Sequence, residues 1–253
     1  MMIEERKTER IRVLGVQVDP VRADRAVNLT VRYLEKHKFE YIVFANTPAA
    51  LLGTEDSVIE EYIDQAALVL PGDSNIEDAI EAKKWLEEGR NYQADYFRRL
   101  FARLYRQRPS IYLMVDKEEQ FSKIQKIMKE KYSRFQVEGN LWREEDSIDG
   151  IVNSINGHAP DILFICAGHE KMSCFLKEHA CKINAGLCFC MEEVVTDVRL
   201  DISEWNHGSR IQKIVFEMKN KASRLFHNIL FKNQMKRNQQ EEEKEEKETS
   251  ESE

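Results

Sequence analysis

INGHAPDILFICAG, residues 155–168, is the stretch that decides the fold. A polar helix end runs into a turn at Gly157, Pro160 and Asp161 open an apolar run, and Gly168 ends it. This order is typical of a helix that leads into a buried parallel strand. The loop that follows lies at the carboxyl end of the strand, where open α/β sheets bind their ligands. We therefore expect an α/β fold with a ligand site near Gly168.

Short apolar runs alternate with amphipathic segments along the rest of the chain. Strands that alternate with helices form right-handed crossovers, which place helices on both faces of a mostly parallel sheet. The sequence therefore predicts an α/β fold with a mostly parallel sheet layered between helices (Rossmann-like) and a C-terminal helical appendage. The expected strands are 11–18, 41–45, 67–70, 111–115, 162–166 and 187–190, and the expected helices are 23–37, 55–65, 76–88, 95–106, 118–132, 145–155, 169–182 and 209–234.

The composition excludes several classes of protein. Of the 253 residues, 42% are hydrophobic, which supports one large α/β domain. No run approaches the ~18 apolar residues of a membrane-spanning helix, and no signal core follows Met1, so we expect a cytoplasmic protein. The net charge is −7, and residues 241–253 alone contribute −6 of it. Nothing overall indicates a nucleic-acid binder.

Changes in composition divide the chain into four segments. We expect an N-terminal extension at 1–10, the α/β domain at 11–200, a basic amphipathic helical appendage at 201–238, and a disordered acidic tail at 239–253. Five cysteines without a secretory signal favour buried reduced thiols over a disulfide framework, with metal or redox chemistry as the alternative. The sequence has no DxD-like pair of carboxylates at the end of an expected strand, so it does not predict a metal site. We also expect no cofactor.

Polar side chains follow the second and third expected strands. Asn46 and Thr47 come directly after one strand, and Asp73 comes after the next. An amide such as that of Asn46 can donate and accept hydrogen bonds to a sugar, although Asn before Thr-Pro is also a frequent turn. A carboxylate at a strand end can act as a general base, although Asp73 can instead favour the N-terminus of a helix. The spacing of the residues alone does not decide between a binding and a turn role for Asn46, or between a catalytic and a capping role for Asp73.

Two further groups of residues are candidates for substrate binding. Arg90 and Asp95 lie five residues apart between two helices, and they could hold a phosphate or form a structural ion pair. Gly168, His169 and Glu170 stand where the expected strand at 162–166 leads into a helix. A helix start can bind an anion, whereas His169 can also be a plain surface or capping residue.

These strand-end segments resemble the WecB/TagA/CpsF family of bacterial glycosyltransferases, from residue 11 to about residue 200. The stretch at 155–168 resembles the second-half signature of that family, Asn46 matches the Asn of its Thr-x-Asn segment, and Arg90 and Asp95 match the ends of its Arg-Val-x-Gly-x-Asp segment. The resemblance implies an enzyme that moves an N-acetylated amino sugar from a UDP-sugar to a lipid-linked acceptor. Asp73 would be the catalytic base, Asn46 would join it in catalysis, and Thr47, Arg90, Asp95, Gly168, His169 and Glu170 would bind substrate.

The chain departs from the family pattern at several strand ends. The family's Asp-Gly becomes Gly72-Asp73, and its glycine pair after the strand at 111–115 is replaced by Asp116 and Lys117. Met172 and Ser173 occupy the positions of its Gln-Glu pair. The alternative is therefore a catalytically inactive paralogue that binds a partner in the same cell-envelope polysaccharide or teichoic acid pathway.

The segment 209–234 carries an apolar stripe flanked by basic residues. A basic amphipathic helix can lie on an anionic membrane, which the lipid-linked acceptor of the family would favour, or it can pack on its own domain. We expect peripheral association with the inner face of the cell membrane, and the sequence leaves homo-oligomerisation open. The expected membrane-binding residues are Arg210, Lys213, Lys221, Arg224 and Lys232.

Overall fold

A computed structural model describes residues 9–36, 38–86, 91–193, 227–238 and 240. Its centre is a six-stranded sheet in which every neighbouring pair of strands is parallel. The spatial order is β4-β3-β8-β7-β5-β6. The predicted parallel α/β architecture is confirmed. The strands are β3 (Glu40–Ala45), β4 (Leu68–Pro71), β5 (Ser110–Val115), β6 (Gln136–Leu141), β7 (Ile162–Cys166) and β8 (Leu187–Met191).

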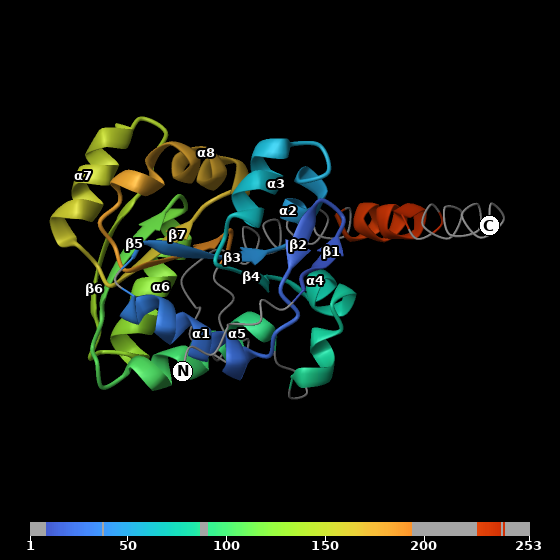
Figure 1. Cartoon of the computed structure of the whole chain (residues 1–253). Coiled ribbons are helices and arrows are strands. Elements are labelled where there is room, and N and C mark those ends of the chain that lie inside the picture. Colours follow the sequence, from blue (N-terminus) through green and yellow to red (C-terminus); the bar gives the residue numbers. More distant parts are fainter. Residues whose placement is uncertain (1–8, 37, 87–90, 194–226, 239, 241–253) are drawn as a thin grey trace, which may run out of the picture.

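Helices cover both faces of this sheet (Figure 1). On one face lie α1, α5 and α6, and on the other lie α3, α7 and α8. Two short helices, α2 and α4, begin directly after β3 and β4 and therefore stand at the carboxyl ends of these strands. The bounds are α1 (Ala23–Glu35), α2 (Thr47–Leu52), α3 (Ser57–Asp64), α4 (Ser74–Ala79), α5 (Tyr92–Leu104), α6 (Glu118–Lys131), α7 (Ile148–His158) and α8 (His169–His179).

The two central strands, β7 and β8, lie in the core of the protein. Every residue of β7 and β8 is buried, which explains why both read as continuous apolar runs. Phe189 of β8 packs against Phe164 in a tilted arrangement and edge-on against Phe97, at ring distances of 5.0 and 5.3 Å. These aromatic contacts join the sheet to α5 and so hold the strand ends in fixed positions.

The segment 11–18 is a hairpin, so the prediction of one strand in the main sheet was wrong. β1 (Ile11–Val13) and β2 (Val16–Val18) pair antiparallel in a separate two-stranded sheet. The turn between them needs Leu14 at φ 56°, and a Cβ on Gly15 would collide with the backbone of Gly53. The hairpin lies against the edge of β4. Asp19, the residue after β2, holds it there, since its N–H donates to Val69 O at 2.8 Å.

Side-chain caps shift several helices from their expected bounds. Asn91 Oδ1 accepts from Ala94 N–H at 2.7 Å, so α5 begins at Tyr92, before the expected 95. Ser147 caps α7 in the same way, and α7 runs over 148–158 instead of 145–155. The expected helix at 76–88 is divided into α4 and a 3₁₀ turn at Ala82–Trp85.

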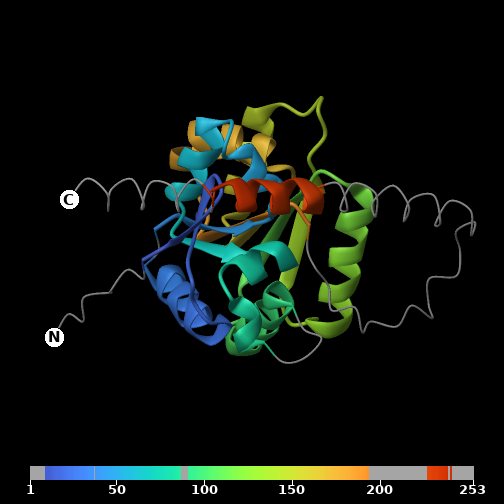
Figure 2. The same ribbon diagram turned by 90° about the vertical axis from the view of Figure 1, so that its right-hand side faces the viewer.

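The C-terminal appendage is described only at its last part, where residues 227–238 are helical. This helix lies across the side of the molecule that faces the reader in Figure 2. Within the described ranges, no helix is long and apolar enough to cross a bilayer. The five cysteines are free; Cys166, Cys188 and Cys190 are buried as expected, whereas Cys174 and Cys181 are exposed.

Candidate active site

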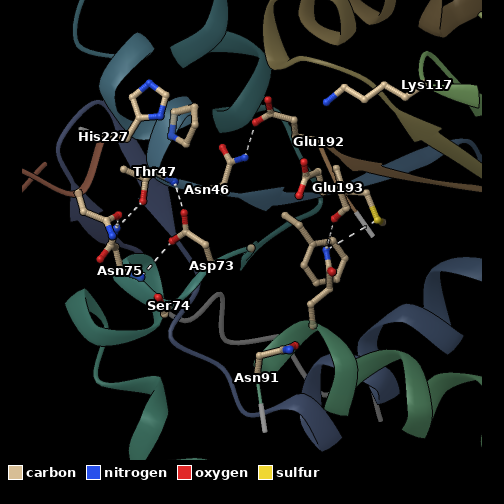
Figure 3. A pocket seen from close by; sticks show the side chains of 16 residues that line it. Asn46, Thr47, Asp73, Ser74, Asn75, Asn91, Lys117, Glu192, Glu193 and His227 are labelled. Atoms are coloured by element: carbon tan, nitrogen blue, oxygen red, sulfur yellow. Dashed lines mark hydrogen bonds between the residues drawn. The ribbon is translucent and has the colours of Figure 1, made fainter. Parts of the chain in front are cut away.

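A pocket of about 490 Å³ opens at the carboxyl ends of β3, β4 and β8 (Figure 3). Its walls come from the loops that follow these strands and from the start of the helix at 227–238. Asn46, Thr47 and Asp73 all line it, so the structure brings these three predicted site residues together. The parallel order of β3 and β4 is the reason, since it places both strand ends at one edge of the sheet.

Asp73 is the N-cap of α4 and also binds the start of α2. Its Oδ1 accepts from the backbone N–H groups of Asn75 and Ile76, both at 3.1 Å. Its Oδ2 accepts from Thr47 N–H at 2.6 Å. The carboxylate therefore satisfies three backbone donors that two helix starts would otherwise leave without partners.

Asn46 joins β3 to the end of β8. Its Oδ1 accepts from Ala49 N–H at 3.0 Å, which makes it the N-cap of α2. Its Nδ2 donates to Glu192 Oε2 at 2.6 Å. Figure 3 shows the amide of Asn46 and the carboxylate of Glu192 pointing toward each other across the pocket. Both halves of the amide are therefore engaged, one in the fold and one in the pocket.

The C-terminal helix forms one wall of the pocket. Asn75 Nδ2 donates to Thr47 Oγ1 at 2.9 Å and to Asn228 Oδ1 at 2.6 Å. His227, the residue before Asn228, also lines the pocket. A side-chain hydrogen bond thus joins the C-terminal helix to the first turn of α4, 153 residues earlier in the sequence.

The lining is rich in amides and carries more negative than positive charge. Among the described lining residues, Asp73, Glu192 and Glu193 supply carboxylates, and Lys117 supplies an ammonium group. Amides and carboxylates are the groups that bind the hydroxyl and acetamido groups of sugars. The amide side chains of the lining belong to Asn46, Asn75, Asn91, Gln93 and Asn228.

His169 does not reach this pocket. Its ring is buried, with 2% of the residue exposed, and packs against Tyr62 of α3 at a ring distance of 6.3 Å. Neither ring nitrogen has a hydrogen-bond partner among the described residues. Burial lowers the pKa of His169 from 6.5 to about 4, because the charged form loses its hydration. The side chain is therefore neutral at pH 7.

The other predicted substrate-binding residues lie apart from the pocket or outside the described chain. Gly168 is the N-cap residue of α8 and Glu170 is exposed in its first turn, and neither lines the pocket. Asp95 is buried in α5, where Arg98 and Arg99 donate to its carboxylate at 2.6 and 2.8 Å. Burial opposes ionisation of Asp95, but these two hydrogen bonds outweigh it and lower its pKa. Arg90 lies outside the described residues.

Several residues of the pocket were not singled out in the sequence. Glu192 and Glu193 follow β8, and Asn75 follows Asp73 in a stretch that reads only as a helix cap. His227 and Asn228 come from the C-terminal segment, which the sequence assigned to membrane binding. The one available signal was the position of Glu192 after a fully apolar strand, the same signal that marked Asn46 and Asp73.

A comparison with protein families finds a match over residues 11–196, to the glycosyl transferase WecG/TagA/CpsF family. The chain belongs to this family. The resemblance drawn from the sequence is therefore confirmed, and the family consists of glycosyltransferases of cell-envelope polysaccharide synthesis. The strand-end loops of the pocket lie within the matched residues, whereas His227 and Asn228 lie outside them. The family implies in general a nucleotide-sugar donor and a lipid-linked acceptor. A comparison with curated proteins finds no match.

The departures from the WecG/TagA/CpsF pattern can now be placed in the fold. Met172 and Ser173, at the positions of the Gln-Glu pair, are both buried inside α8, with 0% and 1% exposed. Asp116, at the position of the glycine pair, follows β5, and its Oδ1 is buried without a partner among the described residues. Lys117, next to it, lines the pocket.

Proposed function

We propose that this member of the WecG/TagA/CpsF family transfers an N-acetylated amino sugar from a UDP-sugar to a lipid-linked acceptor in cell-envelope polysaccharide or teichoic acid synthesis. The observation that carries the proposal is the amide-rich pocket at the ends of β3, β4 and β8, within a chain of this family. Asn46, Thr47 and Asn75 present hydroxyl and amide groups there, which suits the sugar and the acceptor hydroxyl.

The donor's diphosphate belongs on the side of the pocket nearer the start of α6. Lys117 is the ammonium group in the described lining, and it precedes α6, whose N-terminal N–H groups favour an anion. From the family resemblance we also propose that Arg90, Asp95, Gly168, His169 and Glu170 contribute to donor binding from outside the described lining of the pocket. The burial of His169 restricts its contribution to its backbone N–H.

The reaction is an inverting displacement. The acceptor oxygen attacks the anomeric carbon, the bond from that carbon to the diphosphate oxygen breaks, and UDP leaves with the bonding electron pair. The acceptor's proton must pass to a base, and a positioned base contributes on the order of 10²–10⁴-fold to the rate. Asp73 is the base that the family pattern indicates, and Glu192 is a second carboxylate in the same pocket.

A binding and transfer experiment with the full chain tests this function. We expect UDP-N-acetylmannosamine to bind in calorimetry, and its sugar to appear on a lipid-linked sugar acceptor. UDP-glucose, which lacks the acetamido group, is the matched control and should bind more weakly. Binding without transfer would favour the alternative, a catalytically inactive paralogue that acts as a binding protein. Absence of both would refute the proposal.

We also propose that the C-terminal segment attaches the protein to the inner face of the cell membrane. In its described part, Ile229 and Leu230 are 52% and 38% exposed, and Lys232 is exposed beside them. Arg210, Lys213, Lys221 and Arg224 lie outside the described residues. An exposed apolar pair with nearby basic residues is the pattern of a helix that lies on anionic lipid.

Sedimentation with phosphatidylglycerol vesicles tests the attachment. Replacing Lys213, Lys221, Arg224 and Lys232 with Gln should reduce pelleting strongly, because each basic residue near anionic lipid contributes about 1 kcal/mol. Pelleting of the wild type should weaken as salt rises, since the attraction decays over a Debye length of about 8 Å. The matched control makes the same charge change in α6, at Lys123, Lys126, Lys129 and Lys131. Equal pelleting of both variants would exclude a specific role for the C-terminal segment.

A further inference from the structure

The two carboxylates that face the pocket differ in how much of their hydrogen-bonding capacity is in use. A carboxylate offers about four lone-pair positions. Asp73 uses three of them for the backbone N–H groups of Thr47, Asn75 and Ile76. Glu192 Oε2 accepts from Asn46, and no described residue donates to its Oε1. Both oxygens of Asp73 already accept from a helix start, so a proton on either oxygen would weaken a helix cap. A proton on Glu192 Oε1 would weaken no such bond.

Asn46 is oriented so that it holds Glu192 in place. Its Oδ1 is committed to Ala49 N–H in the cap of α2, so the rotation of the amide is determined. The Nδ2 group must then point to the other side, where it donates to Glu192 Oε2. One donor on Oε2 leaves Oε1 free to receive a hydroxyl proton while the carboxylate stays in position.

The backbone around Glu192 is also held rigidly. Glu192 follows β8, whose five residues are all buried between neighbouring strands. Gln120 Nε2 donates to Glu192 O at 3.4 Å, and Gln93 Nε2 donates to Glu193 O at 3.3 Å. The carboxylate is therefore half-buried at the end of a fixed strand, which is the placement that proton transfer requires.

From this geometry we propose that Glu192, rather than Asp73, accepts the acceptor's proton, and that Asn46 is the residue that positions it. This inference rests on the proposed function. As the acceptor oxygen forms its bond to the anomeric carbon, its proton moves to Glu192 Oε1 and the UDP oxygen leaves with the electron pair of the broken bond. Water then takes the proton from the carboxylic acid. Asp73 holds the starts of α2 and α4 that form the pocket wall.

The test compares Glu192→Gln with wild type under saturating donor. We expect kcat to fall on the order of 10²–10⁴-fold, because the amide cannot accept the proton, while the affinity for the UDP-sugar in calorimetry stays unchanged. An acceptor analogue with a thiol in place of the hydroxyl should reduce this loss, since a thiol ionises near pH 8–9 and depends less on a base. Glu130→Gln, an exposed carboxylate in the last turn of α6, is the control and should keep full activity.

A double-mutant cycle tests the positioning role of Asn46. Asn46→Asp keeps the oxygen that caps α2 and removes the Nδ2 donor to Glu192. It should lower kcat in the wild-type background but cause no further loss in the Glu192→Gln background, because it acts through a base that is already absent. A Glu192→Gln enzyme with near-normal kcat on the hydroxyl acceptor overturns this inference and leaves the proposed function intact. A wild-type chain that neither binds the donor nor transfers the sugar overturns both.

Discussion

Asp73→Ala should lower the free energy of unfolding by about 3 kcal/mol, because it leaves three backbone donors at two helix starts without acceptors. An unsatisfied buried polar group costs roughly 1–3 kcal/mol, and the part-buried position of these groups allows water to recover some of that loss. Asp73→Asn should cost about half as much, since its amide oxygen can still cap α4 while its NH₂ group faces Thr47 N–H.

Urea denaturation, followed by transfer assays on the folded protein, separates the two possible roles of Asp73. The expected result for Asp73→Asn is a clear loss of stability with a loss of kcat that is smaller than that of Glu192→Gln. Ser74→Ala, the exposed neighbour at the start of α4, is the control and should change stability by less than about 0.5 kcal/mol. Unchanged stability together with abolished turnover would instead make Asp73 the base, as the family pattern indicates.

His169 should make the protein markedly less stable in mild acid. Its pKa is about 4 in the folded protein and about 6.5 when unfolded, so the unfolded chain binds more protons between these values. The stability that comes from the neutral, buried ring is complete above pH 6.5 and decreases as the pH falls toward 4. This difference between the two pKa values corresponds to a loss of about 3 kcal/mol in the free energy of unfolding at pH 4 and below.

The pH dependence of unfolding in the wild type and in His169→Phe checks this result. Carboxylates also titrate in this range, so the measured quantity is the difference between the two slopes from pH 6.5 to pH 4. The variant should lose about 3 kcal/mol less than the wild type over that interval. His179→Gln, which removes a histidine from the end of the same helix, controls for the loss of an imidazole. Parallel slopes for wild type and His169→Phe would show that His169 is not protected from protons in the folded state.

His169 also shows the limit of predicting site residues from their position at the end of a strand. Its place after β7 predicted a substrate-binding residue, because the carboxyl ends of parallel strands share one edge of the sheet. That argument located Asn46 and Asp73 at one pocket. It does not determine in which direction a side chain points from the first turn of the helix that follows. In α8 the ring turns toward Tyr62 of α3 and is buried in the packing between the two helices.

The sequence by itself determined the parallel sheet, because apolar runs such as 162–166 can be buried on both faces only between layers of helices. It also determined that polar residues at 46 and 73 lie at the same edge. Only the tertiary structure decided which strands are neighbours. β8 lies beside β3, with Val43 opposite Cys190, and this register places Glu192 within hydrogen-bonding distance of Asn46 from 146 residues away. Strand order depends on how whole helices pack across the sheet, and the local pattern around Met191, Glu192 and Glu193 contains no information about it.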